Sequence, residues 1–446
     1  MTQEKLKRAI SLQQSGDLTA AADIYVELIS VGDTQAAVRH NLGIIRLEQG
    51  QLADAMALIQ GVFDEQPDNP ELNGTPSVVG RALYENQHWE AARPWLEKAL
   101  TINPADAASQ FMLERVSPRD YLATEVYDPL ASETLLRYSP REAETYIYTI
   151  DISGTCNLRC PSCPVGNFSS ADRTLGFMPV DLFAKIIAKI KREAIVARPQ
   201  IWLYNWGEPL LHPQLTEIIK EVKKNDLTVH LSTNLNSEHG IAELAKAAPT
   251  EIKISLSGFT EETYSLTHKR GDLSLLKANM YLLRHYLNKY QSATRVWVGH
   301  HLYRTNSDQL ESVRAFCTEL NFEHQPTQAF FQPLEKLVKL ANNEVLPEDE
   351  DLLAKLLVDP RDYLKNIKNH RSGNYDCELR FNQTVINHDG SVALCCSVYD
   401  RSNMLDVKFL DADHQTIEKK KYQHPFCKTC RAASCDYTVT DVMNRR

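Results

Sequence analysis

The chain has 446 residues, of which 43% are hydrophobic and 24% are charged, and its formal net charge is -9. This length exceeds one typical domain and predicts two or three, and the composition is ordinary for a soluble globular protein. No stretch approaches the roughly 18 consecutive apolar residues of a membrane span, and the N-terminus has no apolar signal core. We therefore predict a cytoplasmic protein with no membrane partner.

The N-terminal segment repeats itself at a 34-residue offset, which pairs Leu18 with Leu52 and Ala21 with Ala55. A third unit follows and ends near Pro104. This pattern resembles tetratricopeptide repeats, and the resemblance implies an all-α array whose curved surface holds a peptide or protein partner. The alternative is an appendage that only stabilises or dimerises the protein.

The same segment carries most of the net negative charge, because its 16 acidic and 9 basic residues over 1–115 leave -7 of the total of -9. An acidic surface argues against nucleic-acid binding there. Composition shifts along the chain then predict five parts: a repeat domain (1–115), a connector that is rich in proline (116–144), a central domain (145–340), a helical linker (341–374) and a C-terminal domain (375–446).

The central domain opens with a strand-like run over 146–152, followed by Cys156, Cys160 and Cys163. Three thiolates can ligate three irons of a four-iron cluster, which leaves the fourth iron open to an exogenous ligand. Structural zinc sites usually show paired C-x2-C knuckles instead, so a zinc site is the weaker alternative. The spacing resembles the signature of the radical S-adenosylmethionine (radical SAM) superfamily. This resemblance implies a 4Fe-4S cluster whose open iron binds S-adenosylmethionine (SAM), and reductive cleavage of SAM to a 5′-deoxyadenosyl radical.

Strand-like and helix-like runs alternate from about 145 to 333, as in repeated βα units around a parallel sheet. The predicted strands after the first are 201–204, 227–231, 252–256, 295–298 and a short sixth at 328–331. Six strands fit the partial (β/α)6 barrel of radical SAM enzymes better than a closed eight-stranded barrel.

Further motifs of the central domain resemble the cofactor-binding loops of that family. Gly207 and Glu208 follow the second strand, like the Gly-Gly-Glu motif that receives the methionine ammonium of SAM. Ser232 and Asn234 follow the third strand, like the polar patch that reaches the ribose or carboxylate.

Two more residues complete the resemblance. Ser255 ends the fourth strand, and Arg270 lies in a segment whose arginine can pair with the cofactor carboxylate.

Two positions depart from the family pattern. Trp206 replaces the usual first glycine, and Ser162 stands where an aromatic residue often packs beside adenine. Phe168 or Phe177 could supply that aromatic ring instead.

The C-terminal domain carries a second group of cysteines. Cys377, Cys395, Cys427 and Cys430 resemble the shortened SPASM arrangement called a twitch domain, a small α+β unit with one auxiliary 4Fe-4S cluster. A zinc ribbon is the alternative for these four cysteines. Cys396 and Cys435 could replace one of the ligands or donate a hydrogen atom to a product radical.

These features predict a multidomain radical SAM enzyme, reduced by a donor such as flavodoxin or ferredoxin, that modifies a peptide or protein docked by the repeats. One alternative is a twitch-type dehydrogenase of a small molecule such as an aminocyclitol or sugar. Another is a non-enzymatic metal-binding scaffold. The sequence leaves open the substrate carbon and the net redox change.

Overall fold

The protein is described by a computed structural model, which covers residues 2–32, 35–49, 51–66, 69–85, 89–116, 121–130, 132–140, 146–167, 175–196, 199–370 and 376–438. Two compact units divide the chain, one built from Met1–Arg119 and the other from Asp120–Asn444. Phe168 lies outside the described residues. Among the described residues, no helix combines the length and apolar character needed to cross a membrane.

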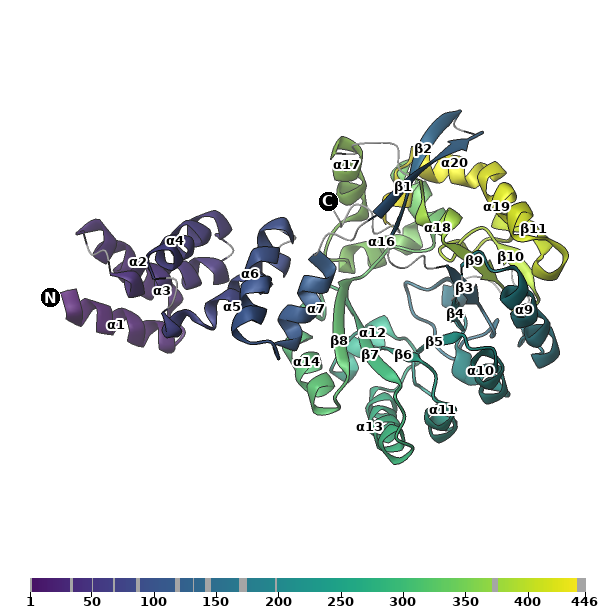
Figure 1. The fold of residues 1–446 in the computed structure, drawn as a ribbon, viewed down its shortest axis with the longest axis horizontal. Coiled ribbons are helices and arrows are strands. Elements are labelled where there is room, and N and C mark those ends of the chain that lie inside the picture. The colour runs from purple at the N-terminus through teal and green to yellow at the C-terminus, as the bar shows by residue number, and fades with distance from the viewer. Residues whose placement is uncertain are drawn as a thin grey trace. The chain divides into compact units, whose positions relative to one another are not determined.

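The first unit is all helical, which confirms the predicted repeat fold (Figure 1). Gly43 and Gly80 let paired helices approach closely. A Cβ added at Gly43 would lie 2.6 Å from Ile59 Cγ1, and one added at Gly80 would lie 2.7 Å from Leu96 Cδ2. The helices are α1 (Thr2–Gln14), α2 (Leu18–Ser30), α3 (Ala36–Glu48), α4 (Leu52–Glu65), α5 (Thr75–Glu85), α6 (Trp89–Ile102) and α7 (Ala107–Val116).

The second unit is built on a nine-stranded sheet with the order β11-β10-β9-β3-β4-β5-β6-β7-β8. Strands β3 to β8 are parallel and form the predicted six-stranded α/β core. They are β3 (Ile147–Ile150), β4 (Gln200–Trp202), β5 (Thr228–Thr233), β6 (Glu251–Ser255), β7 (Arg295–Leu302) and β8 (Glu323–Gln328). The sixth strand thus precedes the predicted range 328–331, because the apolar Phe330 and Phe331 follow the strand rather than form it.

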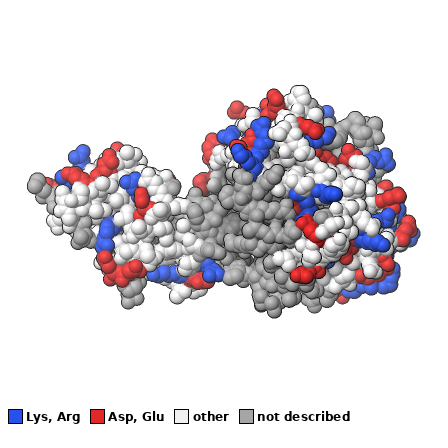
Figure 2. Space-filling model, turned by 90° about the horizontal axis from the view of Figure 1, so that it is seen from above, with Lys and Arg blue, Asp and Glu red and all other residues white. Residues whose placement is uncertain are grey.

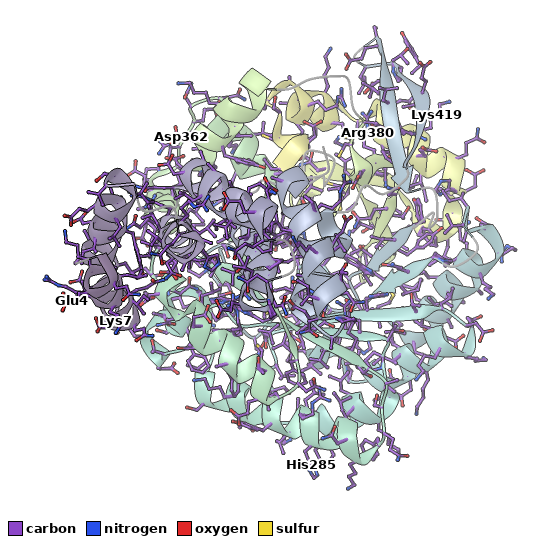
Figure 3. All side chains as sticks on the ribbon, turned by 60° about the vertical axis from the view of Figure 1, so that its left-hand side comes forward. Glu4, Lys7, His285, Asp362, Arg380 and Lys419 are labelled. Carbon is purple, nitrogen blue, oxygen red and sulfur yellow. The ribbon has the colours of Figure 1, made fainter. Side chains whose placement is uncertain are left out.

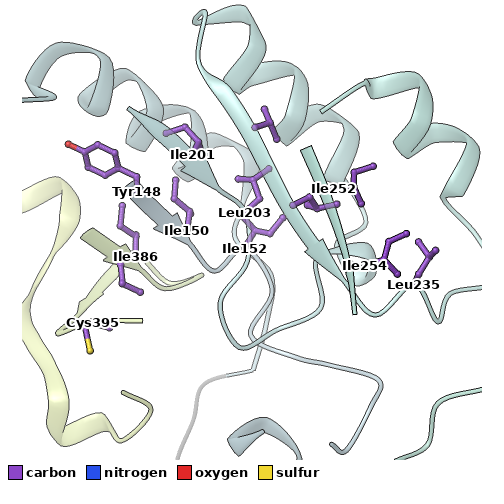
Figure 4. Packing of buried hydrophobic residues seen from close by; sticks show 14 of the residues in the cluster. Tyr148, Ile150, Ile152, Ile201, Leu203, Leu235, Ile252, Ile254, Ile386 and Cys395 are labelled. Carbon is purple, nitrogen blue, oxygen red and sulfur yellow. The ribbon is translucent and has the colours of Figure 1, made fainter. Parts of the chain in front are cut away.

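Helices cover the outer face of this sheet (Figure 1). Aliphatic residues on alternate positions of the strands pack beneath them, among them Ile150, Ile201, Ile252 and Ile254 (Figure 4). The helices of the core are α8 (Pro164–Asn167), α9 (Val180–Glu193), α10 (Leu215–Lys224), α11 (Ile241–Ala247), α12 (Glu261–Thr267), α13 (Leu273–Lys289) and α14 (Leu310–Glu319).

The C-terminal residues extend the same sheet. Strand β9 (Gln383–Ile386) pairs parallel with β3, and β10 (Ser391–Ala393) and β11 (Met404–Lys408) continue it in antiparallel fashion. The remaining helices are α15 (Leu334–Ala341), α16 (Pro347–Lys355), α17 (Pro360–His370), α18 (Glu378–Phe381), α19 (His414–Gln423) and α20 (Pro425–Ala432). Ile386 and Cys395 therefore belong to the same hydrophobic core as the barrel strands (Figure 4).

Part of the predicted connector forms an antiparallel hairpin of β1 (Tyr121–Asp128) and β2 (Glu133–Pro140). Buried Arg380, labelled in Figure 3, pairs with Asp128 at 2.9 Å and with Asp376 at 2.8 Å, and Arg137 pairs with Asp376 at 3.1 Å. These ion pairs attach the hairpin to the C-terminal elements. Elsewhere on the surface, Figure 2 shows basic and acidic side chains interspersed on the face in view.

Candidate functional site

Cys156, Cys160 and Cys163 lie on one loop after β3, at the edge where the parallel strands end. Burial raises the pKa of Cys156 to about 12, with a further contribution from Glu208. Burial also raises the pKa of Cys160, and the neighbouring thiols of Cys163 and Cys156 add to this shift. These half-buried thiols need a cation close by to become thiolates, so this donor set fits a metal centre that displaces the protons.

Two N–H groups approach the sulfur of Cys156. The backbone N–H of Leu158 donates to Sγ at 3.4 Å, and Asn234 Nδ2 donates at 3.7 Å. Hydrogen bonds to cysteine sulfur stabilise the thiolate and tune the potential of an iron-sulfur cluster. Arg159 holds the loop by donating to the carbonyls of Cys156 at 2.9 Å and Leu158 at 2.8 Å.

Glu208 is 4% exposed and connects the loop after β4 with the end of β5. Its carboxylate accepts hydrogen bonds from Thr233 Oγ1 at 2.7 Å, Asn234 N at 2.8 Å and Leu210 N at 3.0 Å. Burial raises the pKa of Glu208, while these donors oppose the shift. A carboxylate has about four acceptor positions, so three donors leave one for a ligand.

Gly207 lies against the cysteine loop so closely that no other residue fits. A Cβ at this position would be 1.6 Å from the Ser153 carbonyl oxygen. The Asp151 carboxylate accepts the backbone N–H groups of Gly207 at 3.3 Å and Trp206 at 3.4 Å. Asp151 was not among the predicted site residues, although an acidic residue directly between the first strand and the cysteines was a usable signal.

Asn157 and Asn236, also missed, join three loops. Asn234 Nδ2 donates to Asn157 Oδ1 at 2.9 Å, and Asn157 Nδ2 donates to the Asn236 carbonyl at 2.6 Å. Asn236 Nδ2 in turn donates to the Tyr264 hydroxyl at 2.7 Å. This network fixes the amide that approaches the sulfur of Cys156.

The other predicted contacts are less constrained. Ser232 and Ser255 are half-buried near the ends of β5 and β6. Arg270 is exposed, and its backbone is left-handed with φ of 70°. Its neighbour Lys269 accepts a backbone hydrogen bond from Arg159 at 2.8 Å, so this segment does border the cysteine loop.

At the first departure from the family pattern, Trp206 turns toward the C-terminal elements. Its Nε1–H donates to the Val398 carbonyl at 3.0 Å, and its ring meets Tyr399 edge to face at 5.9 Å. Trp206 and Tyr399 thereby line a cavity of about 520 Å³, whose polar lining includes His388, Asp389 and Arg401.

At the second departure, the Tyr303 hydroxyl donates to Ser162 Oγ at 3.3 Å. Tyr303 is buried and lies at the carboxyl end of β7. Phe177, one of the predicted substitutes, instead packs edge to face on His212 at 5.4 Å. An aromatic side chain in contact with position 162 is therefore Tyr303, which was not among the predicted site residues.

Cys377, Cys395, Cys427 and Cys430 line one cavity of the C-terminal elements. Cys377 precedes α18, Cys395 follows β10, and the other two lie in α20. Burial raises the pKa of Cys427 to about 11, opposed by the positive charges of Arg380 and Lys421. A cavity lined by three buried cysteines and the half-buried Cys377 fits a cluster with four cysteine ligands.

Cys396 and Cys435 are outside the lining of this cavity. Cys435 is fully buried, and its thiol points to the Ala433 carbonyl at 3.8 Å. Within the described ranges, no three His, Cys, Asp or Glu side chains form a group that could hold a single metal ion. In an iron-sulfur cluster, each cysteine binds a different iron.

Residues 150–316 match the family model described as Radical SAM superfamily. Residues 12–75 match the one described as Tetratricopeptide repeat. The tungsten-containing aldehyde ferredoxin oxidoreductase cofactor-modifying protein of Pyrococcus furiosus is 33% identical over 113 residues, which cover 25% of this chain and 30% of that protein. The match thus spans less than a third of this curated relative.

Solved structures with similar folds include native anSMEcpe with bound AdoMet and Streptococcus suis SuiB bound to S-adenosylmethionine. The first has 17% identity and a TM-score of 0.43, and covers 64% of this chain and 86% of its own. The second has 14% identity and a TM-score of 0.44, and covers 80% of both chains. Neither likeness is close enough to carry a conclusion about function.

Proposed function

We propose that this chain, which contains a radical SAM domain over residues 150–316, cleaves SAM reductively and abstracts a hydrogen atom from a peptide or protein substrate. The observation that carries this proposal is the meeting of three cysteines with the Gly207–Glu208 loop and Asn234 at one edge of the sheet. When bound, the cluster and SAM supply a 5′-deoxyadenosyl radical by one-electron cleavage of the sulfonium.

The protein's own contribution is to hold and orient these groups. Cys156, Cys160 and Cys163 would ligate three irons and leave the fourth to the methionine moiety of SAM. Glu208 keeps its loop fixed against β5, and Gly207 allows that loop to touch the cysteine loop. Ser232, Asn234, Ser255 and Arg270 are the remaining candidate contacts to SAM.

Cys377, Cys395, Cys427 and Cys430 would hold an auxiliary 4Fe-4S cluster, supported by the cavity that they share. Four cysteine ligands leave no open iron, so this cluster would transfer electrons rather than bind substrate. A flavodoxin or ferredoxin would act as the reductant of the enzyme.

The repeats support a peptide or protein substrate, since such arrays usually bind extended partners. One observation favours a small-molecule substrate instead: the cavity of about 520 Å³ beside Trp206. Its volume lies within the roughly 300–1,000 Å³ that is usual for small-ligand pockets.

The first experiment measures 5′-deoxyadenosine formed by the reduced, reconstituted protein without substrate. The wild type should form it, and a Cys156→Ala, Cys160→Ala, Cys163→Ala variant should not. Absence of the product from the fully loaded wild type would contradict the proposal.

The second experiment separates the substrate classes by removing residues 1–115. Substrate-independent SAM cleavage should remain, whereas turnover of a peptide substrate should fall. Unchanged turnover would favour the small-molecule alternative.

A further inference from the structure

Lys253 lies on the inner face of the barrel sheet. Its neighbours on β6, Ile252 and Ile254, are fully buried on the opposite face, beneath the helices. Since side chains alternate along a strand, Lys253 and Ser255 face the lumen. Lys253 is half-buried there.

The side chain of Lys253 runs toward the edge of the sheet that carries the cysteine loop. Its backbone is in register with Trp297, but its Cε lies only 2.8 Å from where a Cβ of Gly299 would be. Gly299 is two residues nearer the carboxyl end of β7 than Trp297. The Lys253 side chain therefore extends toward the carboxyl ends of the strands, across the space that this glycine leaves open. The amine lies 5.2 Å from the Trp297 ring centre.

The lumen around Lys253 provides no matching carboxylate. The nearby acid on the same strand, Glu251, is already paired with Arg295 at 3.0 Å and His230 at 3.5 Å. Burial alone lowers the pKa of Lys253, and no acidic side chain opposes the shift. No ion pair joins Lys253 to an acid in the part of the chain that the structure describes.

His301 faces the same lumen, because it lies two residues beyond Gly299 on β7. Burial lowers its pKa to about 3, and the charge of Lys253 contributes. Two residues later, Tyr303 contacts Ser162 of the cysteine loop. At about 3.3 Å per residue, the level of Gly299 is therefore about 13 Å along the strand from that contact.

We propose that Lys253 anchors an oxyanion of the substrate, a carboxylate or phosphate, in the lumen beneath the cysteine loop. A largely desolvated ammonium that faces an aromatic ring but no carboxylate destabilises the folded protein, and a bound anion reduces this cost. The identity of the anion as part of a substrate rests on the proposed function, whereas the anion site itself does not.

The test measures thermal unfolding midpoints of the anaerobic, cluster-loaded protein in sodium chloride, sodium acetate and sodium phosphate at equal ionic strength. Acetate or phosphate should raise the midpoint of the wild type above its value in chloride, because a ligand that binds the folded state stabilises it. The anion that acts indicates whether the natural group is a carboxylate or a phosphate. The rise should persist with saturating SAM, which occupies its own carboxylate site.

Lys253→Met should lose the anion-dependent rise and should unfold in chloride at the wild-type temperature or above, since it removes a partly buried charge that has no acidic partner among the described residues. Lys246→Met, on the exposed face of α11, should keep the rise. If Lys253→Met does not fold, Gly299→Ala serves instead, because its methyl would displace the amine and should weaken the rise.

Three results would overturn the proposal: no anion-specific rise in the wild type, a rise that Lys253→Met retains, or a rise that SAM abolishes. The last would assign the anion to SAM rather than to a substrate. Iron content and SAM cleavage are measured on the same samples, so failure of the anion site is distinguishable from failure of the proposed reaction.

Discussion

Substituting Gly207 by alanine should separate the two loops that frame the proposed SAM site. The added Cβ would lie 1.6 Å from the Ser153 carbonyl oxygen, and real Cβ contacts essentially never fall below 3.0 Å, so the loops must move apart by about 1.4 Å. The Ser153 oxygen belongs to the backbone carbonyl, so it cannot rotate away as a side-chain atom could. The movement must therefore be taken up by the loops themselves.

Three hydrogen bonds that backbone N–H groups donate cross this contact, two of them to the Asp151 carboxylate. They are Glu208 N–H to the Thr155 carbonyl at 2.8 Å, Gly207 N–H to Asp151 at 3.3 Å and Trp206 N–H to Asp151 at 3.4 Å. At about 1 kcal/mol each, their loss would lower the free energy of unfolding by about 3 kcal/mol. A misplacement of about 1 Å in an active site can reduce a rate about 100-fold.

The assay compares 5′-deoxyadenosine formation by Gly207→Ala, Gly240→Ala and the wild type at equal iron content. Gly240 has a positive φ of 90°, but its added Cβ would meet nothing within 4 Å. Its substitution should cost only about 1 kcal/mol of backbone strain and preserve the rate. A Gly207→Ala enzyme with the rate of the Gly240→Ala control would refute this account of the site.

Three further outcomes are expected. Glu208→Gln turns one of two acceptor oxygens into a donor. The dissociation constant of SAM in equilibrium dialysis should therefore rise about tenfold, which corresponds to about 1.4 kcal/mol. An unchanged constant would argue against a role of Glu208 in binding SAM. Cys427→Ala and Cys430→Ala should each lose the auxiliary iron, whereas Cys435→Ala, outside the cavity, should retain it in anaerobic iron analysis. Arg380→Met leaves two buried carboxylates without this guanidinium and should lower the free energy of unfolding in denaturant titrations by about 3–5 kcal/mol; a loss below about 1 kcal/mol would contradict this.

Regular strands of the core could be predicted because their signal is local. Runs rich in Ile, Val and Leu alternate with amphipathic helices, and the structure confirms the six-stranded arrangement. The last strand, β8, was predicted a few residues too late because its own sequence is polar and contains Pro326. An edge strand needs fewer buried residues and tolerates proline, so its pattern differs from that of the central strands.

The hairpin of β1 and β2 escaped for a different reason. Its proline-rich surroundings indicate a connector, and its attachment depends on Arg380, more than 200 residues away. No local sequence pattern predicts an ion pair between residues so far apart in the chain.

The residues of the site also divide into those that a local sequence pattern reveals and those that only distant contacts reveal. The spacing of Cys156, Cys160 and Cys163 is a local motif and could be read from the sequence. Asp151 and Tyr303 act through contacts with residues 55 and 141 positions away, which only the folded chain reveals.

The central claim is that Cys156, Cys160 and Cys163 hold a cluster with one iron open to SAM. Its most direct test is electron paramagnetic resonance of the reduced, anaerobic protein before and after SAM is added. The account predicts a cluster signal that changes on addition of SAM and is missing from the triple alanine variant at these cysteines. A protein that contains zinc in place of iron, or a signal that SAM leaves unaltered, would contradict it.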